Sequence, residues 1–494
     1  MHLTGGVLIL RGGRVIDPGS DFDAVADVTI DGATVTAVGP ATAGPGDTVV
    51  DVAGYVVGPG FVDLHSHVHS VAGQRLQAMD GVTTALDLEA GLMPVERAYD
   101  EAARAGRPLH YGFSASWAAA RAQVLLGDEP DASIWTTLAL LGRTDWQRSS
   151  SVAERERWLG LLERELAGGA LGIGILQGYA PRTDPAEFTA VAALAARAGA
   201  PTFTHVRELV EADPTTPVDG SHEIVRAAAE TGAAMHHCHV NSTSRRHVER
   251  VLALLDDARA AGSRVSVECY PYGAGATAIG AAFLAPERLP AWGLQPSDLV
   301  VVETGERVAD EARLRALRRD QPEIECLVEF LDEDDPADLA HLERALAYPD
   351  AIVASDAGPV LWADARDTRA WPLPPGGRTH PRTAGTYARS LRVMVRETGT
   401  WSWPDAFRRC SYLPARLLDE VAPAARTKGV LRAGGDADVV VLDPDAVTDT
   451  ATYADGARPS RGVRHLLVAG TFVVRDGELQ PDAYPGRGLR GVPR

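Results

Sequence analysis

The chain of 494 residues contains one lysine, Lys428, among its 48 basic residues, so nearly all of its positive charge is arginine. Any site outside the C-terminal segment must therefore be built without lysine. Cysteine is also scarce, and the four cysteines show neither CxxC spacing nor a disulfide-like pattern. We expect reduced thiols in the cytoplasm. The four are Cys238, Cys269, Cys326 and Cys410.

Long apolar runs and excess positive charge are missing as well. No stretch is long and apolar enough to span a bilayer, and the N-terminus lacks the basic start and apolar core of a secretion signal. The net charge is −19, which argues against nucleic acid or an anionic membrane as partner. The expected partner is a small-molecule substrate, and the sequence leaves open whether the chain forms a homo-oligomer.

Short β-branched runs separated by turns occur at both ends of the chain and predict small antiparallel strands. We expect residues 1–57 and 425–494 to form one discontinuous small domain, a β-sandwich made by both termini. The middle, 58–424, has a different pattern and is expected to form the catalytic domain.

Strand-like and helix-like segments alternate through this middle part, which predicts a parallel sheet with crossover helices. Helical patterns occupy 152–167, 184–198, 222–231 and 243–261. Strands are expected at 58–64, 82–88, 110–116, 171–176, 201–205, 233–239, 264–270 and 351–355. Eight such strands predict a (β/α)8 TIM-like barrel, an α/β fold whose active site lies at the C-terminal ends of the strands. An interval of about 280–350 is expected to be an insertion over or beside the barrel mouth.

The first expected barrel strand ends in His65-Ser66-His67. Residues two apart on a strand point to the same face, so both imidazoles can reach one metal ion. A bare His-x-His also fits a surface turn. The metal interpretation gains support because histidines or acids recur at the ends of later expected strands.

An acid follows the second expected strand, where Glu89 could bind one metal or bridge two. A carboxylated lysine, the bridge in many two-metal barrel hydrolases, is impossible within this barrel because the only lysine is Lys428. Glu89 is preferred as the bridge, and Asp87 is the alternative. Asp87 lies two residues earlier, deeper on the same face.

His205 ends the fifth expected strand and His239 the sixth, and together they make a good pair for a second metal. Two hydrogen-bonded histidines at strand ends are the alternative. His236 and His237 compete with His239, and His237 shares its face but lies deeper.

Asp356 ends the eighth expected strand. An aspartate there can bind metal, take a proton from an activated water and later give it to a leaving nitrogen. A core aspartate paired with an arginine is the other interpretation.

The order His-x-His, acid, His, His, Asp resembles the metal-dependent amidohydrolase superfamily, and within it the N-acyl-D-amino acid deacylase (D-aminoacylase) branch. The likeness covers nearly the full length. The motifs that carry it include Gly60-Phe61-Val62-Asp63-Leu64-His65-Ser66-His67, Gly81-Val82-Thr83-Thr84, Gly178-Tyr179-Ala180-Pro181, Thr204-His205-Val206-Arg207, Tyr270-Pro271-Tyr272, Ser355-Asp356, His380-Pro381-Arg382 and the stretch Lys428–Val440.

The resemblance implies metal-dependent cleavage of an amide bond beside a free carboxylate. The expected metal is Zn²⁺, as one or two ions, with Mn²⁺ or Fe²⁺ as alternatives. The residues that the resemblance implies for substrate binding are Arg382, Tyr272, Asn241, Tyr179 and Arg207. A guanidinium suits this task because its fork matches two carboxylate oxygens.

The chain departs from the branch at two informative positions. The branch usually has a metal-bridging cysteine near the end of the second strand, where this chain has Glu89 and Ala90. It also commonly has a lysine two residues after the sixth-strand histidine, where this chain has the uncharged Asn241. The resemblance makes an N-acyl-D-amino acid deacylase the first hypothesis, and the Asn241 departure motivates a cyclic-amide alternative. The alternatives are a dihydroorotase- or hydantoinase-like hydrolase of a cyclic amide, lactam or imide, and a catalytically silent scaffold.

Overall fold

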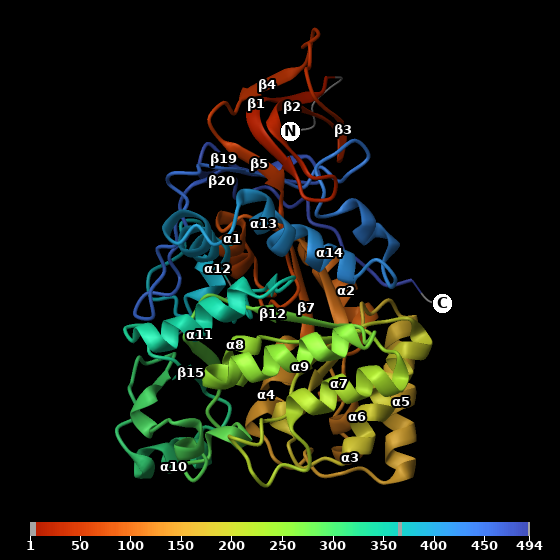
Figure 1. Ribbon diagram of the computed structural model, residues 1–494, viewed down its shortest axis with the longest axis vertical. Helices are drawn as coiled ribbons and strands as arrows, with labels where there is room; N and C mark the ends of the chain where they lie inside the picture. The colour runs from red at the N-terminus through yellow and green to blue at the C-terminus, as the bar shows by residue number, and fades with distance from the viewer. Residues whose placement is uncertain (1–5, 364–367, 493–494) are drawn as a thin grey trace.

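The computed structural model describes residues 6–363 and 368–492 and divides into a small sheet, a barrel and an insertion (Figure 1). In Figure 1 the red and blue strands of the two chain ends lie together at the top. The barrel and its helices fill the middle, and the green insertion with α10 (Glu311–Asp320) lies at the lower left.

Eight parallel strands form the barrel in the order β16-β12-β11-β10-β9-β8-β7-β6. Each of the eight expected strands overlaps one of them, so the predicted fold is confirmed. The strands are β6 (Phe61–Asp63), β7 (Val82–Leu92), β8 (His110–Ser116), β9 (Ile173–Leu176), β10 (Thr202–His205), β11 (Met235–His237), β12 (Val265–Cys269) and β16 (Ile352–Val353).

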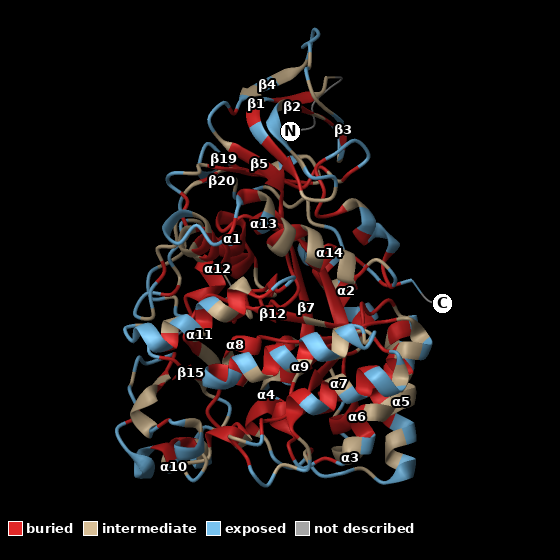
Figure 2. Cartoon of the chain, in the orientation of Figure 1, coloured by how far each residue is buried: buried red, intermediate tan, exposed pale blue. Residues whose placement is uncertain are grey.

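Helices follow the strands and cover the outside of the barrel, with their exposed faces outward and their buried faces toward the strands (Figure 2). Local sequence fixes their ends. Ser151 and Glu154 form a capping box at the start of α5, and α6 begins with Pro185 after the capping residue Asp184. The helices are α1 (Val71–Met79), α2 (Val95–Ala105), α3 (Trp117–Leu126), α4 (Ile134–Ala139), α5 (Val152–Ala167), α6 (Pro185–Ala198), α7 (Gly220–Thr231), α8 (Val240–Ser244), α9 (Val248–Ala260), α11 (Pro336–Ala347), α12 (Arg382–Ser390), α13 (Trp403–Phe407) and α14 (Leu413–Leu417).

The run 58–64, which the sequence pattern predicts as one strand, belongs to two strands in two different sheets. Strand β5 (Val56–Pro59) pairs with β1 (Leu8–Asp17) and β17 (Val439–Leu442) of the small sheet, whereas β6 pairs with β7 of the barrel. The chain crosses between the sheets at Gly60, whose N–H donates to the Asp438 carbonyl at 2.9 Å. A Cβ at Gly60 would collide with the Thr83 side chain, so the crossing requires glycine.

Both chain ends contribute to one nine-stranded sheet, as the sequence predicts. The prediction that its strands are antiparallel is only partly right, because β4 (Thr48–Asp51) and β5 pair in parallel with β1. A separate apolar core joins its two halves, with Leu8, Val28 and Ile30 from the N-terminal part and Val439 and Leu467 from the C-terminal part. The strands are β1 (Leu8–Asp17), β2 (Phe22–Asp31), β3 (Thr34–Val38), β4 (Thr48–Asp51), β5, β17 (Val439–Leu442), β18 (Val463–Val468), β19 (Thr471–Arg475) and β20 (Glu478–Leu479).

The end of the described chain leaves this sheet and lies against the barrel. The Leu489 amide donates to the Tyr111 carbonyl at 2.7 Å, and the Tyr99 hydroxyl donates to the Leu489 carbonyl at 2.6 Å. The boundaries predicted at 57/58 and 424/425 remain predictions, and the C-terminal segment links the two parts that they separate.

The insertion between β12 and β16 contains a three-stranded antiparallel sheet, in the order β13-β15-β14. Its strands are β13 (Ala274–Ala278), β14 (Leu299–Val301) and β15 (Glu325–Glu329). Within the described part of the chain, no helix is long and apolar enough to cross a membrane.

The barrel closes between its first and last strands through a short polar seam. A parallel bridge joins Ser66 to Ala357 just beyond the two strands. Beneath it the buried Asp63 carboxylate accepts the Ser355 amide at 3.0 Å and also the Ser355 hydroxyl. Gln77 donates to the same carboxylate at 3.0 Å. His65 and His67 follow Asp63 closely in the chain, and Asp356 follows Ser355 directly. The seam therefore fixes the positions of these three residues relative to one another.

Replacing Ser355 by alanine removes one donor to a buried carboxylate, and we expect it to lower the free energy of unfolding by about 1–3 kcal/mol. Urea unfolding followed by circular dichroism measures this. The half-exposed Ser297, whose hydroxyl makes no hydrogen bond within the described chain, provides the control, because Ser297→Ala should change stability by less than about 0.5 kcal/mol. Equal stability of both variants would show that the seam does not hold the barrel closed.

Candidate metal centre and active site

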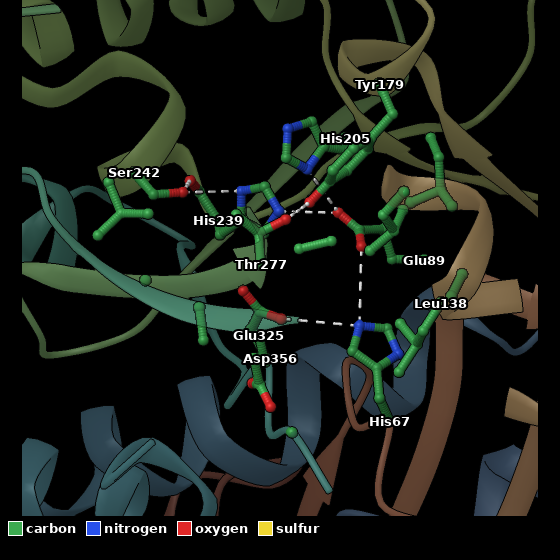
Figure 3. A pocket seen from close by; sticks show the side chains of 18 of the residues that line it. His67, Glu89, Leu138, Tyr179, His205, His239, Ser242, Thr277, Glu325 and Asp356 are labelled. Atoms are coloured by element: carbon green, nitrogen blue, oxygen red, sulfur yellow. Dashed lines mark hydrogen bonds and ion pairs between the residues drawn. The ribbon is translucent and has the colours of Figure 1, made fainter. Parts of the chain in front are cut away.

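A cavity of about 340 Å³ opens at the C-terminal ends of the barrel strands. Histidines and carboxylates form its floor, and the insertion forms one wall through β13 and β15. Figure 3 shows Glu89 between the His205–His239 pair on one side and His67 on the other. The structure thus brings together the predicted ligands in one place: His65, His67, Glu89, His205, His239 and Asp356.

Glu89 is shared between two groups of imidazoles. Its Oε1 lies 2.8 Å from His239 Nε2 and 3.2 Å from His205 Nδ1. Its Oε2 lies 3.2 Å from His65 Nε2 and 3.8 Å from His67 Nε2. One carboxylate therefore faces two neighbouring donor sets, one through each oxygen.

A bulge in β7 places Glu89 in this position. Strand β7 pairs regularly with β8 up to Asp87, and its register then shifts before Leu92. The intervening residues leave the ladder, as in a β-bulge, and turn Glu89 toward the barrel axis. Asp87, the alternative bridge, instead accepts hydrogen bonds from His67 Nδ1 at 3.2 Å and His69 Nε2 at 2.9 Å. Asp87 thus lies outside the groups that could hold a metal and orients the imidazole of His67 through a hydrogen bond.

Asp356 lies opposite Glu89 and faces the first histidine pair. Its Oδ1 is 3.3 Å from His65 Nε2 and 3.7 Å from His67 Nε2. Its Oδ2 is 2.9 Å from Arg382 Nη1. Asp356 and His239 both have left-handed backbones, with φ of 50° and 34°. Such conformations are costly for non-glycine residues and cluster at functional sites.

A further carboxylate, Glu268 on β12, supports the cluster from below. It accepts from His65 Nδ1 at 2.6 Å and from His236 Nε2 at 2.9 Å. His236, one of the two alternatives to His239 as a metal ligand, is thus hydrogen-bonded to Glu268. The other alternative, His237, points its Nδ1 to the Cys238 carbonyl at 3.1 Å. Neither belongs to the group formed by Glu89, His205 and His239.

The carboxylates of the cluster stabilise a positive charge on His65. Burial opposes a charge on His65, but Asp356, Glu89 and Glu268 together hold the pKa of this imidazole well above its usual value. Burial similarly acts to raise the pKa of Glu89, yet His65 and His239 hold that pKa well below its usual value. Burial lowers the pKa of His205, which favours the neutral, metal-binding form.

This donor set fits a pair of metal ions. Imidazole nitrogens and carboxylate oxygens are ordinary zinc ligands, and a carboxylate can bind one ion through each oxygen. The first group would consist of His65, His67 and Glu89, with Asp356 within 3.7 Å of both histidines. The second would consist of Glu89, His205 and His239. The hydrogen bonds that Glu268 and Asp87 accept from ligand histidines correspond to the outer support that metal-binding histidines usually have.

Two of the five predicted substrate-binding residues line the cavity. The Tyr179 hydroxyl lies 2.8 Å from Thr277 Oγ1, and its ring lies against His205 with centroids 4.7 Å apart. A Cβ at Gly178 would collide with the His205 ring, which explains the glycine in this motif. The Arg382 guanidinium lies over the ring of Tyr270, 5.0 Å from its centroid.

The other three predicted substrate-binding residues do not line the cavity, because their polar atoms are engaged elsewhere. Arg207 is fully buried and makes two 2.9 Å bonds to Glu223. Asn241 bonds the backbone of Tyr270 and Tyr272 at 3.3 and 3.4 Å. The Tyr272 hydroxyl donates to the Pro381 carbonyl at 3.4 Å. These three residues support the cavity wall in this structure.

The sequence argument missed three residues of the site. Glu268 is an acid near the end of an expected strand, and the rule that selected Glu89 could have found it. Tyr270 lies in the Tyr-Pro-Tyr motif from which Tyr272 is predicted to bind substrate, and Tyr270, not Tyr272, lines the cavity. Glu325 lines the cavity from the insertion, and no local pattern indicates it. Burial raises the pKa of Glu325 to about 7.

A parallel barrel with histidines and carboxylates gathered at the C-terminal strand ends has its candidate site where (β/α)8 enzymes have their active sites. Residues 48–474 match the amidohydrolase family, and the chain belongs to that family.

Relatives that match over nearly the full length of the chain include two deacylases of N-acyl-D-amino acids. The chain is 28% identical over 511 residues to the N-acyl-D-glutamate deacylase of Alcaligenes xylosoxydans xylosoxydans, covering 98% of this chain and 96% of the relative. It is 28% identical over 512 residues to the D-aminoacylase of the same organism, covering 97% and 96%. The crystal structure of the Bordetella bronchiseptica N-acyl-D-glutamate deacylase, complexed with zinc and a phosphonate inhibitor, superposes with a TM-score of 0.75 at 23% identity, covering 98% and 99%.

We expect Glu89→Ala to lower the zinc bound after metal loading by about one ion per chain or more, because the substitution removes a ligand from both groups. Asp87→Ala removes only an outer support and should lower the zinc content less. Elemental analysis of the two purified variants beside the wild type measures this. The reverse order would reassign the bridge to Asp87.

Glu268→Gln should weaken zinc binding roughly 10–100-fold, since the amide can no longer accept hydrogen bonds from both His65 and His236. Competition with a chromophoric chelator gives the affinity. Glu249→Gln is a matched control, because Glu249 is exposed and pairs with Arg344 on the outer helices. An affinity equal to that of this control would show that Glu268 does not support the centre.

Proposed function

We propose that this enzyme is a zinc-dependent amidohydrolase that removes the acyl group from an N-acyl-D-amino acid. The observation that carries the proposal is the Glu89 carboxylate between two imidazole groups, with Asp356 beside the first of them. The full-length similarity to deacylases of N-acyl-D-amino acids supports the substrate class. It also favours a linear amide over a cyclic one.

Zinc held by the six residues would supply Lewis-acid activation of water and polarisation of the amide carbonyl. The chain's own residues would manage the proton. Asp356 Oδ1 points toward the cluster, where it can accept the proton of the attacking water. The same carboxylate can then deliver that proton to the leaving amine nitrogen.

Arg382 would hold the carboxylate of the substrate. Its guanidinium is fixed by Asp356 through Nη1 and by the ring of Tyr270, so it is oriented before substrate arrives. Arg382 and Tyr179 face the same cavity as the histidines, which would place the amide bond near the cluster. Orientation of this kind accounts for a large share of catalysis in an amide hydrolase.

A panel of N-acetyl-D- and N-acetyl-L-amino acids tests the substrate class with zinc-loaded protein. We expect release of the free amino acid from D-isomers and at least roughly tenfold lower kcat/KM for the matching L-isomers. Absence of turnover with every D-isomer would refute the substrate assignment. Turnover of a hydantoin or dihydroorotate ring under the same conditions would support the cyclic-amide alternative.

Asp356→Asn should retain most of the bound zinc and lower kcat by roughly 10²–10⁴-fold, because an amide cannot accept and return the proton. Elemental analysis and steady-state kinetics on the same preparation separate the two effects. If kcat were unchanged with full metal content, Asp356 would not be the proton carrier.

A further inference from the structure

The cavity carries more negative charge than the metal cluster accounts for. Besides Glu89 and Asp356, three carboxylates line it: Glu325 inside, and Glu303 and Glu323, which are exposed at its rim. All three come from the insertion between β12 and β16. The insertion therefore gives the substrate space an acidic side.

Glu325 reaches deepest of the three. It begins β15, where it pairs with Ala278 of β13, and its side chain extends toward the loop that follows Asp356. A Cβ on Gly358 would lie 3.1 Å from its Oε1, so the carboxylate lies beside this loop. Figure 3 shows Glu325 next to Asp356. Among the described residues, none donates a hydrogen bond to the Glu325 carboxylate. The Arg382 charge acts on it from a distance, so its oxygens remain available to a ligand.

Positive charge is limited on the same surface. Among the lining residues that the structure describes, Arg382 is the one arginine or lysine, and it already pairs with Asp356. One guanidinium can hold one substrate carboxylate. A second carboxylate, such as the side chain of a D-glutamate derivative, would meet Glu325 without a cation of its own.

Much of the remaining wall is apolar, and its polar residues carry uncharged hydroxyl groups, such as those of Ser242, Thr243 and Thr277. Large side chains from three parts of the chain face the cavity, among them Trp135, Leu141, Phe283, Ile324 and Leu361. These surfaces suit the methylene groups of a long side chain or of an acyl group, and they offer no compensation to an unpaired charge.

We infer that Glu325 is a specificity-determining residue that receives a positively charged substrate side chain and repels a negatively charged one. The preferred substrates are then N-acyl-D-amino acids with a basic side chain, such as D-arginine, in contrast to the D-glutamate derivative after which one relative is named. The inference rests on the proposed deacylase function for its choice of substrates.

The test compares N-acetyl-D-arginine with N-acetyl-D-glutamate on zinc-loaded protein at about pH 8.5, where carboxylates are ionised. We expect the wild type to show a kcat/KM at least roughly tenfold higher for the arginine derivative, because opposed like charges are strongly disfavoured in a desolvated site. In Glu325→Gln this ratio should fall toward one. Using the ratio removes any general loss of activity from the comparison.

Glu329→Gln is the matched control, because Glu329 lies on the same strand, outside the cavity, and pairs with Arg307. The wild-type ratio should persist in this variant. Equal or faster turnover of the glutamate derivative by the wild type, or a ratio that Glu325→Gln leaves unchanged, would overturn the inference.

Failure of the deacylase proposal is distinguishable from failure of this inference. If neither derivative is hydrolysed, the proposed function fails, and calorimetric dissociation constants for the same two compounds then decide the role of Glu325. Tighter binding of the arginine derivative that is lost in Glu325→Gln would uphold that role. Equal binding, or no binding of either, would refute it.

Discussion

The whole site depends on the sharing of the Glu89 carboxylate among four imidazoles. Its two oxygens face His205 and His239 on one side and His65 and His67 on the other. The buried Glu89 carboxylate and the His65 imidazole stabilise each other's charge, and a buried charge without a partner would be costly. The bulge in β7 is therefore more than a local irregularity, because it delivers the one group on which both halves of the cluster converge.

The barrel around this cluster is arranged to keep it rigid. Glu268 and Asp87 orient histidines from below, and the Asp63–Ser355 seam joins the first and last strands directly beneath the ligands. Supports of this kind fix both the tautomer and the direction of a ligand imidazole. The insertion contributes apolar walls and carboxylates to the cavity through a sheet of its own, separate from the barrel. The clustered histidines and the cavity wall opposite them thus come from different elements.

Much of this arrangement could be predicted from the sequence, because periodicity and strand ends carry the information. All eight barrel strands follow from apolar runs, and the six clustered residues follow from the histidines and acids at the ends of five of these runs. The break at Gly60 could not be predicted, since one continuous apolar run serves two sheets and only packing against Thr83 separates them. The directions in which individual side chains point could not be predicted from the sequence either. Arg207 follows His205 by two residues, yet its guanidinium turns to Glu223, and Tyr270 rather than Tyr272 faces the cavity.

The single lysine has a consequence outside catalysis. The Lys428 ammonium is buried in the small sheet region, 2.7 Å from Asp438 and 2.9 Å from Asp436. Burial opposes its charge, but the two aspartates outweigh that effect and raise its pKa, so the nitrogen is protonated and a poor nucleophile. The folded chain consequently offers no reactive lysine side chain to acylating reagents, lysine-directed cross-linkers or enzymes that attach groups through an isopeptide bond. The composition and fold of the chain thus protect it from modification on lysine.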